Sequence, residues 1–105
     1  MATGLIGQAE RRDDRRLAPE DAGWHRVAWL RPGHEVELVN LSKRGALVQS
    51  ASCLKPGTRS ELQLSGTARR TVRGRIDRSR VIRLEPLRYE AAVVFEERLA
   101  RVGSG

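Results

Sequence analysis

Alternating apolar and polar residues divide most of this chain into short segments separated by turns. Residues 24–31 form an apolar and aromatic segment, and residues 35–39 alternate valine and leucine with glutamate. Strict alternation is typical of a half-buried strand, and the intervening Pro32 and Gly33 are typical of a turn. The two segments are therefore predicted to form a β-hairpin.

Four further strands are predicted along the chain. They cover residues 46–48, 61–64, 72–76 and 87–95. In the strand at 72–76, apolar residues and a glycine face one way, while Arg73 and Arg75 face the other. In the last strand one face carries only apolar and aromatic side chains: Leu87, Tyr89, Ala91, Val93 and Phe95. Short strands with regular turns are typical of a small antiparallel barrel or sandwich.

Both ends of the chain differ from this pattern. Residues 1–9 carry small residues and are expected to form a flexible tail. Residues 10–23 form a charged arm that ends in a polar connector. Residues 96–103 are predicted to form a short helix whose Leu99 and Val102 pack back on the strands.

Arginine dominates the charge of the chain. The formal net charge of the 105 residues is +7, and only Lys43 and Lys55 of the 20 basic residues are lysine. Guanidinium groups fork onto phosphates and stack on flat rings, so this bias indicates an anionic partner. A G+C-rich genome produces the same bias, and composition alone does not separate the two explanations.

Several classes of protein are disfavoured by what the chain contains. One cysteine, Cys53, provides no disulfide framework, and His25 and His34 lack metal-site spacing. The sequence contains no glycine-rich motif of the kind that binds phosphate. Its adjacent acidic residues, at 13–14, 20–21 and 96–97, are typical of a solvated surface rather than of a catalytic pair. No apolar run is long enough to span a membrane, and we expect no secretion signal because residues 1–7 have no basic segment followed by a long apolar one. We therefore expect a cytoplasmic protein that is not an enzyme and needs no metal or cofactor.

Two polar groups of residues carry the candidate chemistry. Arg11 with Arg15, and Arg12 with Arg16, are four residues apart, so each pair shares a face of a helix or wraps a ligand from an extended arm. The second group lies between two predicted strands: Asn40, Ser42 and Gly45. Asparagine and serine can hydrogen-bond a base edge, and glycine allows positive φ or close backbone approach. An ordinary strand connector uses the same residue types.

Together, these groups resemble the PilZ domain family. The resemblance rests on the RRDDRR segment at 11–16, the NLSKRGALV segment at 40–48 and the closing strand at 89–95. It covers about residues 10–100. It implies a mainly β fold: a six-stranded antiparallel β-barrel with a flanking C-terminal helix. The single domain would comprise residues 10–103, with the arm at 10–23, the barrel at 24–95 and the helix at 96–103.

The resemblance also implies a function, binding of the bacterial second messenger cyclic di-GMP. In this family the arginines of the first motif bind the phosphates and stack on guanine, and by position these would be the arm residues Arg11, Arg12, Arg15 and Arg16. The second motif contacts a guanine at the barrel surface, and by position its residues would be Asn40, Ser42 and Gly45. Asn40 replaces the commoner aspartate, which removes a carboxylate and implies weaker binding. Ordering of the arm would then signal to a downstream protein partner.

Two alternatives remain open at this point. The chain could be a PilZ-like protein-interaction module without a ligand. It could also be a nucleic-acid-binding barrel that uses the arginines between Arg69 and Arg83, which otherwise form a solvated strand face. Aromatic residues make up only 4% of the chain, which disfavours nucleic acid, and Trp24 and Trp29 are expected in the core or at a barrel end.

Overall fold

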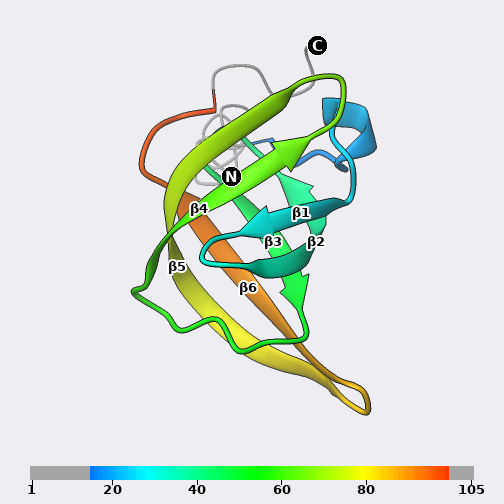
Figure 1. The fold of residues 1–105 in the computed structure, drawn as a ribbon, viewed down its shortest axis with the longest axis vertical. Helices are drawn as coiled ribbons and strands as arrows, with labels where there is room; N and C mark the ends of the chain where they lie inside the picture. Colours follow the sequence, from blue (N-terminus) through cyan, green and yellow to red (C-terminus); the bar gives the residue numbers. More distant parts are fainter. Residues whose placement is uncertain (1–14, 100–105) are drawn as a thin grey trace, which may run out of the picture.

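Six antiparallel strands close into a β-barrel in the computed structural model, which describes residues 15–99 (Figure 1). The strands are β1 (Val27–Leu30), β2 (His34–Leu41), β3 (Gly45–Ser50), β4 (Arg59–Ser65), β5 (Arg69–Leu84) and β6 (Leu87–Phe95). Their order around the barrel is β1-β2-β3-β6-β5-β4. The predicted mainly β class, the six strands and their closure into a barrel are confirmed. A 3-10 turn, η1 (Glu20–Ala22), precedes β1.

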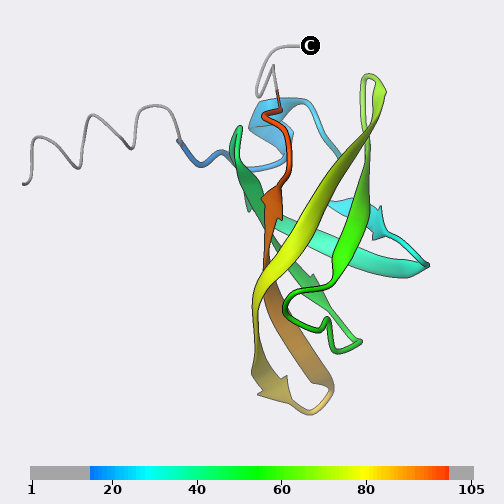
Figure 2. The same cartoon turned by 90° about the vertical axis from the view of Figure 1, so that its left-hand side faces the viewer.

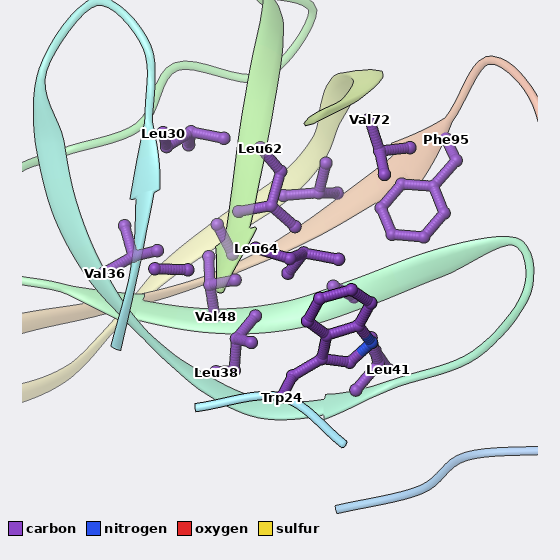
Figure 3. Close-up of a cluster of buried hydrophobic side chains, with 14 of the residues drawn as sticks. Trp24, Leu30, Val36, Leu38, Leu41, Val48, Leu62, Leu64, Val72 and Phe95 are labelled. Atoms are coloured by element: carbon purple, nitrogen blue, oxygen red, sulfur yellow. The ribbon is translucent and has the colours of Figure 1, made fainter. Parts of the chain in front are cut away.

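Alternation along the strands accounts for the barrel interior. In β2, Val36 and Leu38 are buried while Glu35 is exposed, as the sequence pattern predicts. Equivalent apolar positions of the other strands meet them in one core, which Figure 3 shows in close-up. Trp24 also packs into this core, as expected. Burial of each large apolar side chain contributes about 1.5–3 kcal/mol.

The hairpin formed by β5 and β6 extends beyond the rest of the barrel (Figures 1 and 2). β4 pairs with β5 only over residues 69–75, and β3 pairs with β6 only over residues 89–94. Two register shifts in β5, after Ile76 and after Val81, break its alternation. We call residues 77–88 the protruding hairpin. It exposes four large apolar side chains: Val81, Ile82, Leu84 and Leu87.

The predicted C-terminal helix is wrong over residues 96–99, which are not helical. Their backbone groups bond elsewhere: the Glu96 N–H donates to the Arg73 carbonyl over 2.8 Å, and the Leu99 N–H donates to the Lys43 carbonyl over 2.7 Å. Leu99 is nevertheless buried against the barrel, as predicted. The rest of the predicted helix, the predicted tail and arm residues 10–14 lie outside the described residues. Within residues 15–99, no helix is long and apolar enough to cross a membrane.

Candidate functional site

A β-bulge determines where the Asn40 side chain lies. Val36 and Leu38 face the core, so uninterrupted alternation would also turn Asn40 inward. The register between β2 and β3 shifts between Leu38 and Asn40. As a result Asn40 is partly exposed, and Leu41 takes the buried position instead. A bulge of this kind re-aims a side chain at the rim of a barrel.

Ser42 shapes the turn between β2 and β3. Its side chain is buried, and its hydroxyl oxygen accepts a hydrogen bond from the Arg44 N–H over 3.2 Å. The Ser42 N–H donates to the Gly45 carbonyl over 2.8 Å. Ser42 therefore fixes the conformation of the turn from its buried side, while Lys43 and Arg44 at the tip of the turn are exposed.

Gly45 is required by the packing of β3 against β6. A Cβ atom at this position would lie 2.5 Å from the Val93 carbonyl oxygen. Among the described glycines, positive φ values occur at Gly23 and Gly57, and not at Gly45. Of the two reasons that the sequence offers for this glycine, close backbone approach applies, and the approaching group is the β6 backbone.

The arm and the turn meet, although they are far apart in the sequence. Leu17 and Leu41 form an isolated antiparallel bridge, with N–H···O distances of 2.9 and 3.0 Å in the two directions. One residue earlier, Arg16 Nη1 donates a hydrogen bond to Asn40 Oδ1 over 3.2 Å. The structure thus brings together one residue from each candidate group. Arg15 is exposed beside this contact, and Arg11 and Arg12 lie outside the described residues.

Further basic side chains surround this end of the barrel. A hollow of about 330 Å³ lies beside the turn, and two cations, Arg44 and Arg98, and two carboxylates, Glu96 and Glu97, are among the residues that line it. Neither Arg44, Lys43 nor Arg98 forms an ion pair with any residue in the part of the chain that the structure describes. The sequence analysis assigned no role to these three residues. Lys43 and Arg44 lie within the NLSKRGALV segment at 40–48, so their position in the turn between two strands was the signal that could have identified them.

Other arginines are already paired on the outer wall of β2, β3, β6 and β5. Arg88 contacts Glu37 over 3.0 Å, and Arg80 contacts Glu90 over 3.1 Å. The pair of Arg80 and Glu90 joins the neighbouring strands β5 and β6, and the pair of Arg88 and Glu37 reaches from β6 across β3 to β2. Since Arg80 and Arg88 have carboxylate partners, the unpaired cations around the turn are the better anion ligands.

No known protein-family model matches this chain, and neither does any curated protein or solved structure. Its site is therefore characterised by geometry: an arginine of the arm lies against a bulge-directed asparagine, beside a turn with exposed cations. Among residues 15–99, no cluster of histidine, cysteine, aspartate or glutamate could hold a metal ion. The arrangement offers hydrogen-bond donors and positive charge to a small anionic ligand.

Proposed function

We propose that the protein is a PilZ-like receptor for cyclic di-GMP, bound jointly by the arm and the β2–β3 turn. The hydrogen bond between Arg16 and Asn40 carries this proposal, because it brings the two groups of the motif to one place. Cyclic di-GMP has two phosphates and two guanines. It therefore needs charged donors for the phosphates and an amide or hydroxyl for a guanine edge, and this end of the barrel has both.

The hydrogen bond between Arg16 and Asn40 is weak enough for a ligand to replace it with contacts of its own. It lies at the surface, where a hydrogen bond contributes only about 0.5–1.5 kcal/mol. A phosphate accepting two parallel N–H bonds from a guanidinium is a stronger partner. On binding, Arg16 would turn to a phosphate and release the Asn40 amide for a guanine. Arg15 lies next to it, and Arg11 and Arg12 would complete the arm by their spacing.

Ser42 and Gly45 act in this proposal as positioning residues. The buried Ser42 hydroxyl accepts the Arg44 N–H, and Gly45 lets β3 approach β6. Both therefore fix the turn that presents Asn40. The side chains in direct contact with the nucleotide are then Asn40 and the arginines of the arm.

The protruding hairpin supports the signalling part of the proposal. It exposes four large apolar side chains within one short hairpin, and exposed apolar surface of this kind is used at protein interfaces. Three of the four arginines in residues 77–88 already have carboxylate partners: Arg78, Arg80 and Arg88. We therefore propose that the downstream partner is a protein that docks on these apolar side chains. Ordering of the arm on the nucleotide costs about 2–5 kcal/mol, which the ligand contacts must exceed.

Calorimetric titration with three nucleotides tests the ligand. We expect saturable heat with cyclic di-GMP and far weaker binding of GMP and cyclic di-AMP. Asn40→Ala should weaken binding of cyclic di-GMP by about tenfold or more, since a lost hydrogen bond to a charged or buried group costs about 1.5–3 kcal/mol. Asn40→Asp should tighten it, because a carboxylate accepts two guanine donors. A folded barrel that binds none of the three nucleotides would instead support the ligand-free interaction module.

A further inference from the structure

Trp29 lies on the outer wall of the barrel. Ala28 and Leu30 point into the core, so strand alternation turns Trp29 outward, where 46% of its surface is exposed. The expectation that it packs in the core is wrong. An exposed tryptophan on a strand offers a flat ring face to solvent. A ligand with a flat ring of its own can stack on this face.

Polar groups suited to a nucleobase surround this ring. Trp29 pairs with Gln63 of β4, which pairs with Thr71 of β5, so the three form one row across the wall. A hollow of about 320 Å³ lies beside the row, and Ser65 also lines it. The amide offers a donor and an acceptor, and the hydroxyls offer both as well. These neutral groups can hydrogen-bond the edge of a base that stacks on Trp29.

Arginines flank the row on both sides. Arg69 and Arg70 line the same hollow, and Arg73 lines an adjacent one of about 510 Å³ together with Arg31 and Arg59. Arg31 is paired with Glu61 at 3.5 Å, and Arg59 with Glu96 at 3.8 Å. Arg69, Arg70, Arg73 and Arg75 form no ion pair with another residue of the described part of the chain. Arg69 and Arg70 are therefore uncompensated cations beside the aromatic ring, and Arg73 and Arg75 follow along β5, while Glu35 of β2 is the cross-strand neighbour of Trp29 on its other side.

We infer that the outer face of β1, β4 and β5 binds single-stranded nucleic acid. One base would stack on Trp29 beside Gln63, and the flanking phosphates would lie against arginines such as Arg69 and Arg73. Aromatic side chains in a basic groove are typical of proteins that bind single strands. A duplex hides the faces of its bases, so it would use only the charges. The face shares no residue with the site of Arg16 and Asn40.

Fluorescence anisotropy with a labelled oligothymidine of about twelve nucleotides tests this inference. Trp29→Ala should weaken binding by about five- to 150-fold, the loss measured for removal of a stacking ring, whereas Trp29→Phe should retain most of the affinity. Arg73→Ala should weaken binding and lower the salt slope by about one. The matched control is Arg83→Ala, which removes an exposed arginine of the protruding hairpin. It should change neither the affinity for the oligonucleotide nor the salt slope.

A second readout reports the stacking itself. In a Trp24→Phe background Trp29 is the sole tryptophan, so the oligonucleotide should quench its emission. Equal affinity of Trp29→Ala and the wild type would overturn the inference, and so would equal binding of a duplex of the same length. A polyglutamate that competes as well as the oligonucleotide would show a site for acidic peptides instead. Arg16→Ala should leave oligonucleotide binding unchanged, so failure here is distinguishable from failure of the cyclic di-GMP proposal.

Discussion

Replacement of Gly45 by alanine should push the neighbouring strands β3 and β6 apart. The added Cβ would lie 2.5 Å from the Val93 carbonyl oxygen, whereas ordinary contacts begin near 3.4 Å. β3 would therefore have to move about 0.9 Å away from β6 at this point. The obstacle is backbone, so a change of side-chain rotamer cannot relieve it. The pairing of Gly45 with Val94 and of Ala46 with Val93 would be strained.

The expected cost follows from these contacts. Overpacking of this kind destabilises a protein by about 1–3 kcal/mol. The free energy of unfolding should fall by this amount, and Tm by roughly 5–20 °C for a domain of this size. Thermal and urea unfolding followed by circular dichroism would measure both quantities.

Gly33→Ala is the matched control for this substitution. A Cβ at Gly33 would meet nothing within 4 Å, and the φ angle there is not positive. This variant should be neutral, or more stable by up to about 1 kcal/mol, because alanine restricts the unfolded chain. If Gly45→Ala unfolds at the wild-type temperature, the packing explanation for Gly45 is refuted. If it unfolds early as predicted, weaker ligand binding by this variant would not identify Gly45 as a ligand contact.

Two further predictions concern the core and the tryptophans. Leu38→Ala should lower the free energy of unfolding by about 2–5 kcal/mol in urea titrations, because it opens a cavity in the centre of the core. A loss below 1 kcal/mol would show that Leu38 is not packed as described. Acrylamide should quench Trp29 in a Trp24→Phe variant much more strongly than it quenches Trp24 in a Trp29→Phe variant, since Trp24 is 9% exposed and Trp29 is 46% exposed. Equal quenching would contradict this placement.

Strand alternation made most of the barrel predictable. The inward positions of β2 and of the first half of β5 follow directly from the spacing of Val36, Leu38, Val72 and Ile76. These positions repeat every second residue up to the bulge after Leu38 in β2 and the register shift after Ile76 in β5. The β1–β2 hairpin was predictable because a Pro-Gly turn separates an apolar and aromatic segment from the alternating residues 35–39.

Features that depend on distant backbone groups could not be predicted in this way. The bulge before Asn40 and the register shifts in β5 change which residues face outward, and no local signal marks them. The segment after Phe95 has a helical pattern, but the carbonyls of Lys43 and Arg73 take its N–H groups. Contact between Arg16 and Asn40 depends on the path of the arm past β2, which spacing does not contain.

Titration of cyclic di-GMP into the wild type, Arg16→Ala and Arg83→Ala tests the central claim most directly. Both arginines are exposed, and only Arg16 lies at the proposed site, so the pair separates a specific contact from a general loss of charge. The wild type and Arg83→Ala should bind equally, and Arg16→Ala should bind about tenfold more weakly or worse. Absence of binding to the folded wild type, or equal binding by all three proteins, would contradict the proposed site.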